Sequence, residues 1–310
     1  MTAAADRRTE RDRTGRGRPE QARPRWSRDR VETVTFGVLR WVVIVVLVLV
    51  TAFPFYYMVV LSVRTLDEVV ARPALLWPQT FDWSTYANVL APADAGGQGF
   101  LVFLRNSAIL AVLTVLFTLF AAIPGAYAIS RLEFFGRRQV SALFLAVYLF
   151  PAILLAVPLF VFFSAIGLRG SLVGLVVVYV AQTVPISIYL LRNYMAGLPK
   201  EIMESARIDG ASHFKIFTGM VLPLSFPALA SFSIFQFLWV WNDLLVAMVF
   251  LGAQEGKLVL TGKLVSLLGS RGNNWEILTA GAFVTIVVPL IVFFSLQRYF
   301  VRGLLAGSVK

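Results

Sequence analysis

Long uncharged apolar runs alternate with short polar segments along most of the chain. Six runs contain no Lys, Arg, Asp or Glu, at residues 41–63, 106–130, 139–168, 170–191, 216–242 and 277–297. Each reaches the roughly 20 residues that a helix needs to cross about 30 Å of hydrocarbon. We therefore predict six transmembrane helices in an all-α integral membrane fold. A transmembrane β-barrel is excluded, because its strands alternate apolar and polar residues over about ten positions.

The charge distribution predicts the orientation of these helices. Only 15% of the 310 residues are charged, whereas soluble domains average about 25%. With both termini in the cytoplasm, the inner segments hold 21 of the 28 basic residues and the outer segments hold seven. Basic residues accumulate in this way on the cytoplasmic side of membrane proteins. The net charge of +11 thus reflects topology rather than binding to nucleic acid.

The first 35 residues form an Arg-rich stretch without an apolar run, which a cleavable signal peptide would need. We predict a disordered cytoplasmic tail over 1–35 and a permease domain over 36–310. The tail either touches anionic lipid or has no specific role, and both readings stay open. The chain has no cysteine, which excludes disulfides and thiolate metal sites.

Prolines and aromatic residues add detail to the predicted helices. The first helix, over about 37–62, is expected to break at Pro54, and the third and fourth helices also contain prolines. Prolines free backbone carbonyls, which neighbouring helices or a water-lined cavity must satisfy. The outer segment 64–105 contains Trp77, Phe81 and Trp83. These aromatics form either an interfacial belt or a cap over an external vestibule.

A polar segment at 198–223 lies between the fourth and fifth apolar runs and has a helical pattern. Pro199 suits a first helical position, and Glu201 is favourable near the positive end of the helix dipole. Gly210, after Asp209, is placed to turn the chain in a left-handed conformation. Ser212 can cap a second short helix. The segment is too short and too charged to cross a bilayer.

The second short helix is expected to place Phe214, Phe217 and Val221 on one face and to end at Leu222-Pro223. Two readings follow from the residues alone. Either this helix–turn–helix docks in the cleft of a partner protein, or it anchors the loop at the membrane surface.

The same segment resembles the EAA motif of binding-protein-dependent ABC importer permeases. Residues 204–211 read E-S-A-R-I-D-G-A, and M-V-L-P follows after nine residues counted from Gly210. The usual form is E-A-A, three residues, G, nine residues, I-x-L-P. Ser205 replaces the second residue of the motif, and Met220 replaces an isoleucine. Both changes leave the long fixed spacing intact.

The resemblance covers most of residues 36–310. The ending 297–310 is similar to the tail of maltose-type (MalG-like) carbohydrate permeases, and 81–90 with 105–107 resembles their first outer loop. The runs 235–247 and 269–272 look closest to the α-glucoside branch. The resemblance implies the type I importer (MetI-like) fold and a bacterial inner-membrane location. It also implies four partners: a second permease, a P-loop ATPase dimer, an extracytoplasmic sugar-binding protein and the lipid bilayer.

Site residues follow from the resemblance residue by residue. It implies that the coupling loop 193–223 docks on the ATPase, through Glu204, Ser205, Ala206, Asp209, Gly210, Ala211, Phe214, Leu222 and Pro223. The C-terminal tail 299–310 is a second expected ATPase contact, through Gly303, Gly307 and Lys310. The expected function is a carbohydrate permease subunit that does not hydrolyse ATP itself. The sequence has no G-x-x-x-x-G-K-[ST] loop, so ATP and Mg²⁺ are expected on the partner ATPase. We expect no catalytic residue, cofactor or metal in this chain, and His213 is expected to be a surface residue or partner contact.

Asp243 is the residue on which the alternative function, an ion-coupled secondary carrier, would depend. A charged group in an apolar context is a functional hypothesis by default, and an ion-coupled secondary carrier would couple through this carboxylate. Counting from Ser225 at 1.5 Å per residue places Asp243 near the outer interface, however. Aromatic and amide side chains there could bind sugar or simply pack. The candidate substrate path is Trp239, Trp241, Asn242, Asp243 and, in the fourth helix, Gln182.

Overall fold

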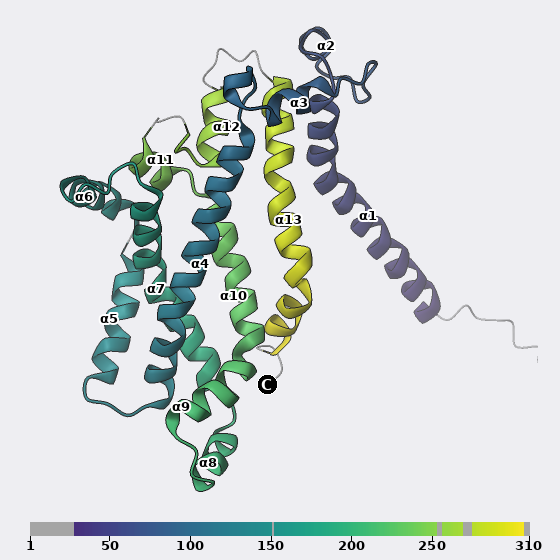
Figure 1. Cartoon of the computed structure of the whole chain (residues 1–310). Coiled ribbons are helices and arrows are strands. Elements are labelled where there is room, and N and C mark those ends of the chain that lie inside the picture. The colour runs from purple at the N-terminus through teal and green to yellow at the C-terminus, as the bar shows by residue number, and fades with distance from the viewer. Residues whose placement is uncertain (1–27, 151, 253–255, 269–274, 307–310) are drawn as a thin grey trace, which may run out of the picture. The chain divides into compact units, whose positions relative to one another are not determined.

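The computed structural model describes residues 28–150, 152–252, 256–268 and 275–306, and all the regular secondary structure in these residues is helical (Figure 1). The predicted all-α fold is therefore confirmed for these residues. The first helices are α1 (Arg28–Ser62), α2 (Leu66–Ala71), α3 (Ser84–Leu90), η1 (Ala93–Ala95), α4 (Phe100–Arg131), α5 (Arg137–Leu149) and α6 (Ala152–Ala165). They are followed by α7 (Leu172–Ala196), α8 (Lys200–Ile208), α9 (His213–Ile216), η2 (Phe217–Val221), α10 (Leu222–Asn242), α11 (Leu245–Leu251), α12 (Leu260–Leu268) and α13 (Trp275–Ala306).

The chain divides at Pro54 into two compact units, residues 1–54 and 55–310. In the first unit, the described residues belong to α1, whose apolar side chains are largely exposed. The expected break at Pro54 is wrong, because α1 continues as a helix through this residue to Ser62. Residues 1–27 of the predicted tail lie outside the described part of the chain.

In the second unit, α4 packs along α7, and α10 packs against both α13 and α4 (Figure 1). Two apolar cores hold these helices together. One core includes Phe100, Tyr179 and Trp241 and lies toward α11 and α12. The other includes Ala126, Met195 and Met203 and joins α4 and α7 to α8. Each core is built from segments distant in the sequence, so the bundle depends on tertiary packing rather than on helix propensity.

Five helices of the described residues are long and apolar enough to cross a membrane. These spans are Glu32–Ser62, Phe100–Arg131, Leu172–Ala196, His213–Asn242 and Trp275–Arg298. The third predicted span, 139–168, is not one helix, because α5 and α6 are separate. Phe150 ends α5 with an extended backbone at ψ 127°. The following residue in the sequence is Pro151, and a proline disfavours helical geometry in the residue before it.

Candidate functional site: the docking loop and a membrane cavity

The polar segment folds into the predicted helix, sharp turn and helix. α8 begins at Lys200, so Pro199 is its N-cap and not its first helical residue as expected, and Glu201 lies in the first turn as predicted. Gly210 has φ +79°, in the left-handed region, so the predicted turn is confirmed. The Ser212 hydroxyl accepts a hydrogen bond from the Lys215 N–H at 3.3 Å, which confirms it as the N-cap of α9. Local sequence signals thus account for the shape of this segment, residues 199–216, which we name the docking loop after the role proposed for it below.

One face of the docking loop packs on the bundle and the other is exposed. Met203 and Ala206 are buried in the core with α4 and α7. Ile208 and Phe214 are instead 87% and 74% exposed. Exposed apolar side chains at the tip of a charged loop are typical of a protein-protein contact. Ile208 was missed by the sequence reasoning, although it lies off the stripe of Met203 and Ala206 and could have been found by its position on the helical wheel.

The docking loop is tied to the ends of two long helices. The Arg131 guanidinium, at the end of α4, donates to the backbone oxygens of Met195 and Leu198, the latter at 2.7 Å. The Tyr127 hydroxyl donates to the backbone oxygen of His213 at 3.3 Å. The ring of Tyr127 also packs on Phe217, with centroids 4.8 Å apart. The docking loop therefore contacts α4 through Tyr127, and Arg131 connects α4 to the end of α7, just before the loop.

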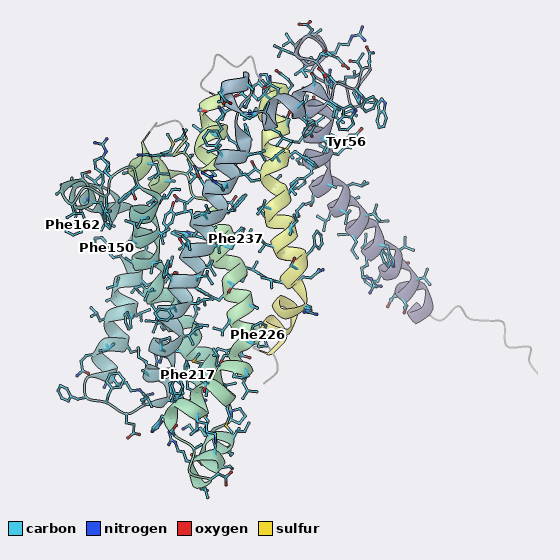
Figure 2. The ribbon with its side chains drawn as sticks, viewed as in Figure 1. Tyr56, Phe150, Phe162, Phe217, Phe226 and Phe237 are labelled. Atoms are coloured by element: carbon cyan, nitrogen blue, oxygen red, sulfur yellow. The ribbon has the colours of Figure 1, made fainter. Side chains whose placement is uncertain are left out.

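The expected common face of Phe214, Phe217 and Val221 does not form. Phe214 is exposed, Phe217 is half-buried with its ring against that of Tyr127, and Val221 is buried. Figure 2 shows Phe217 at the lower end of the bundle, next to the docking loop. The cause is the π-helical stretch η2, closed by a bond from the Leu222 N–H to the Phe217 oxygen. Its wider turn adds one residue and shifts the helical register. The expected stop at Leu222-Pro223 is also wrong, because the helix continues from η2 into α10, with proline tolerated in its first turn.

The expected coupling residues differ in how exposed their side chains are. Glu204, Ser205, Asp209, Gly210, Phe214 and Pro223 are exposed, Ala211 and Leu222 are half-buried, and Ala206 is buried. Ala206 thus supports the loop from inside rather than offering a contact. His213, the single histidine of the chain, has an exposed side chain. In the expected tail contact, Gly303 falls within α13, while Gly307 and Lys310 lie outside the described residues.

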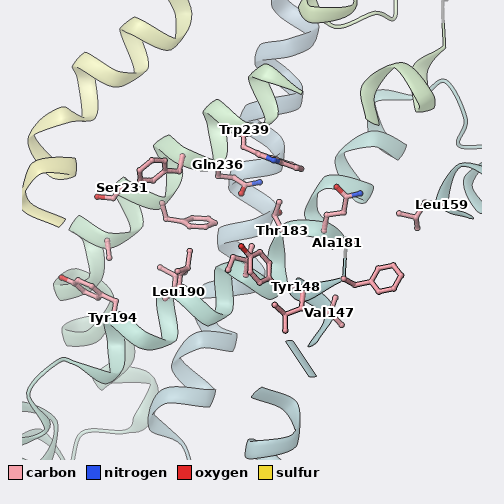
Figure 3. Close-up of a pocket in the computed structure, with 18 residues that line it drawn as sticks. Val147, Tyr148, Leu159, Ala181, Thr183, Leu190, Tyr194, Ser231, Gln236 and Trp239 are labelled. Carbon is pink, nitrogen blue, oxygen red and sulfur yellow. The ribbon is translucent and has the colours of Figure 1, made fainter. Parts of the chain in front are cut away.

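A cavity of about 960 Å³ opens among α5, α6, α7 and α10. Figure 3 shows Ser231, Gln236 and Trp239 following one another along α10 on one side of it. Tyr148 comes from α5 and Gln182 from α7. Two predicted path residues, Gln182 and Trp239, therefore do line one cavity. No Asp, Glu, Lys or Arg is among the described residues that line it.

The cavity wall contains amide groups without a hydrogen-bond partner in the described part of the chain. These are both polar atoms of Gln182 and the Nε2 of Gln236, a side chain only 5% exposed. Unpaired buried amides are costly, so their presence in native proteins requires an explanation. Gln236 was missed by the sequence reasoning, although it is an amide inside an uncharged run, which is the same signal that identified Gln182.

Three other predicted path residues do not line this cavity. Trp241 is buried and stacks on Phe237, with centroids 5.4 Å apart. Asn242 donates from its side chain to the Leu238 oxygen within its own helix. The Asp243 carboxylate accepts a hydrogen bond from the Tyr179 hydroxyl at 2.5 Å. The sequence predicts one cluster of these three residues with Trp239, and only Trp239 of the four lines the cavity.

Asp243 acts as a structural acceptor at the corner between α10 and α11. Besides the Tyr179 hydroxyl, its carboxylate accepts the N–H of Ala247 at 3.0 Å. Its backbone oxygen accepts the Thr261 hydroxyl at 2.8 Å. The carboxylate therefore joins α7 to the first turn of α11, where a negative group is also favoured by the helix dipole.

We expect the Asp243→Asn substitution to leave uptake largely unchanged, because an amide oxygen can still accept the hydrogen bond from Tyr179. Asp243→Leu should instead lower the yield of folded protein, since the buried Tyr179 hydroxyl then loses its acceptor at a cost of about 1–3 kcal/mol. Thermal unfolding of the two variants in detergent compares them directly. Complete loss of transport in a well-folded Asp243→Asn protein would contradict the structural role and favour ion coupling.

Comparisons with known proteins agree with this geometry. Residues 115–305 match the family described as "Binding-protein-dependent transport system inner membrane component". The alpha-glucoside transport system permease protein AglG of Rhizobium meliloti (strain 1021) is 55% identical over 238 residues, or 75% of this chain and 61% of that relative. The match thus spans less than two thirds of AglG. The osmoprotective compounds uptake permease protein GgtD of Synechocystis sp. is 46% identical over 230 residues, covering 74% of this chain and 76% of GgtD.

The fold is also found in a solved transporter. A chain in the crystal structure of a bacterial ABC transporter involved in the import of the acidic polysaccharide alginate aligns with a TM-score of 0.71 and 26% identity. The alignment covers 90% of this chain and all of that one. These matches confirm the family resemblance inferred from the docking motif. The chain belongs to the family of binding-protein-dependent transport system inner membrane components.

Proposed function

We propose that this chain is a transmembrane permease subunit of an ATP-driven importer for carbohydrate, with α-glucosides or oligosaccharides as its substrates. The main support is the docking loop, which exposes Ile208 and Phe214 while the bundle holds its other face. The similarity to AglG, an alpha-glucoside transport permease, supports the substrate class. The chain has no phosphate-binding loop of its own, so ATP and Mg²⁺ would bind to a partner ATPase.

The proposed topology has six crossings and both termini in the cytoplasm. The helix α5 has 13 residues and a length of about 20 Å, which is short of a 30 Å hydrocarbon core. The third crossing in this proposal therefore uses α5 and α6 together. The distribution of basic residues supports the cytoplasmic placement of the docking loop and of both ends.

The complete transporter would contain a second permease, two P-loop ATPase subunits and an extracytoplasmic sugar-binding protein. Closure of the ATPase dimer would move the docking loop, and Arg131 and Tyr127 would pass that movement to the bundle. The bundle would then rock as a rigid body between outward-facing and inward-facing states. The tail residues Gly303, Gly307 and Lys310 would form a second ATPase contact.

The cavity among α5, α6, α7 and α10 is the part of the sugar path that this subunit would contribute. Sugars are bound by aromatic faces and by amide hydrogen bonds, and Trp239, Gln182 and Gln236 provide both. The absence of charged groups from the described lining suits a neutral glycoside. The runner-up, an ion-coupled carrier, has less support, because the Asp243 carboxylate is already bonded to Tyr179 and Ala247.

The assembly is tested by recovering the tagged chain from native membranes in mild detergent and identifying its partners by mass spectrometry. We expect a P-loop ATPase and a second permease to be recovered with it. Phe214→Ser should reduce recovery of the ATPase but not of the second permease. A chain that purifies alone and still transports sugar in vesicles would contradict the proposal.

The sugar path is tested by Gln236→Leu, which keeps the side-chain volume but removes the amide. Losing one hydrogen bond to the sugar should lower kcat/KM for α-glucoside uptake about tenfold. The matched control is Gln139→Leu, which removes an exposed amide of α5 outside the cavity. Uptake is measured with the assembled transporter in proteoliposomes. Equal effects of the two substitutions would exclude Gln236 from the path.

A further inference from the structure

A second cavity, of about 500 Å³, lies between the beginning of α5 and the end of α7. Arg137, Arg138 and Ser141 line it from α5, and Tyr189 and Arg192 line it from α7. It is separate from the proposed sugar path, with which it shares no lining residue. Three guanidinium groups therefore meet in one small space between two helices.

The positive charges in this cavity are not neutralised by the described part of the chain. None of the three arginines has a described carboxylate within 4.0 Å. Arg192 donates to the Ser141 hydroxyl at 2.9 Å, and Arg137 donates to the Ser130 oxygen at 3.3 Å. Each guanidinium has five N–H donors, so most donors remain available to a ligand.

The helix α5 adds further positive potential to the cavity. It has 13 residues and begins at Arg137, whose N–H donates to the Phe134 oxygen at 3.3 Å, while the N-cap Gly136 has no side chain to pair with the N–H groups that follow. The first N–H groups of a helix lack partners within the helix and attract anions. The guanidinium groups and the helix dipole thus favour the same ligand chemistry, a phosphate group.

The remaining wall of the cavity is apolar and is formed by Ile129, Ala142 and Leu145. A free phosphate ion would gain nothing from these side chains, whereas the acyl chains of a lipid would cover them. We propose that this cavity binds an anionic phospholipid, with its phosphate among Arg137, Arg138 and Arg192 and its acyl chain along Leu145. Basic pockets between membrane helices bind lipid head groups in this way.

The site adjoins the docking loop. Arg192 is near the end of α7, which continues into α8 within a few residues. A lipid bound between α5 and α7 would hold these two helices together at the base of the docking loop. Its assignment to the cytoplasmic leaflet rests on the proposed topology, but the lipid site itself does not.

The test uses the full-length chain, purified in mild detergent, stripped of lipid and incubated with mixed micelles of phosphatidylglycerol or phosphatidylcholine. Native mass spectrometry counts the lipids that remain bound. We expect one retained phosphatidylglycerol and weaker retention of phosphatidylcholine. Arg138→Gln combined with Arg192→Gln should weaken phosphatidylglycerol binding by about 25-fold, since each basic residue near the surface contributes about fivefold.

The control combines Arg72→Gln with Arg105→Gln, which removes the same charge at two exposed arginines outside the cavity. It should retain phosphatidylglycerol like the wild type. Circular dichroism checks that each variant is folded. The double variant Arg138→Lys with Arg192→Lys keeps both positive charges and should bind more phosphatidylglycerol than the glutamine pair. Equal loss in both glutamine pairs, or equal retention of both lipids, would overturn the proposal. Complete displacement of the lipid by excess inorganic phosphate would also overturn it, because the site would then bind free anions.

Discussion

The Gly210→Val substitution is expected to abolish recovery of the ATPase with this chain and to abolish ATP-driven uptake. Gly210 has φ +79° between α8 and α9, and a β-branched residue is strongly disfavoured at this angle. A Cβ at this position would meet no atom within 4 Å, so the effect comes from backbone strain rather than from a clash. Strain of about 1–3 kcal/mol should open the turn and change the position of α8 relative to α9. Co-purification and uptake measure the two losses.

Two matched variants isolate the role of the backbone angle. Gly210→Asn should retain the ATPase, because asparagine adopts the left-handed conformation more readily than other residues with a side chain. Gly219→Val places the same side chain in η2, where the glycine is exposed and a Cβ again has open space. It should therefore have a smaller effect on ATPase recovery. If Gly210→Val recovers the ATPase normally, the turn at Gly210 is not needed for docking.

The Arg64→Met substitution is expected to unfold the segment between α1 and α3 locally, although Arg64 looks in the sequence like an ordinary loop residue. Its side chain is fully buried. The Nη2 donates to the backbone oxygens of Glu68 at 2.8 Å and Arg72 at 2.7 Å, and the Nη1 donates to that of Leu75 at 3.3 Å. Methionine would remove all three hydrogen bonds from this charged donor, at a cost of about 3 kcal/mol.

Glu68 extends the same network. Its carboxylate lies 3.3 Å from the Arg64 Nε and accepts hydrogen bonds from the Gln79 N–H and the Thr80 hydroxyl. The hydrogen bond from Gln79 is the main cause that holds the pKa of Glu68 below its ordinary value. A depressed carboxyl pKa stabilises the fold above the unfolded pKa, and this stability is lost as the pH falls through the lowered value. Acid should therefore loosen the segment further.

Hydrogen exchange of the backbone amides in 65–82 measures the effect of Arg64→Met. We expect exchange about 100-fold faster than in the wild type, in line with a local loss near 3 kcal/mol. The control Arg72→Met removes an exposed guanidinium from the same segment and should change exchange little. Unchanged protection in the Arg64→Met protein would show that the guanidinium does not hold the segment.

The docking loop was predictable because its signals are local. Proline before α8, glycine at the turn and serine before α9 act through the backbone of their immediate neighbours. The π-helical stretch η2 was not predictable from the same residues. In this stretch Ile216 and Val221, which are five positions apart in the sequence, both lie in the core. Only packing against α4 and α7 makes this five-residue spacing favourable.

The predicted sugar path shows the limit of sequence proximity. Trp239, Trp241 and Asp243 are near neighbours in the sequence, but successive residues of a helix are 100° apart around its axis. Trp239 faces the cavity, Trp241 faces the core, and Asp243 bonds to Tyr179. The sequence indicated which side chains could bind sugar, but their direction depends on where the neighbouring helices pack.

The sequence by itself determined the membrane class, the family and the helix–turn–helix shape of residues 199–216, because apolar length, motif spacing and turn chemistry are properties of contiguous residues. The division of the third apolar run at Phe150 also had a local cause in the proline that follows, although a count of uncharged residues does not show it. Tertiary structure alone decided that Arg64 is buried and that Gln182 and Gln236 line one cavity. It also decided that three arginines from α5 and α7 share a second cavity. These arrangements join residues from different segments, and only the packing of the helices brings such residues together.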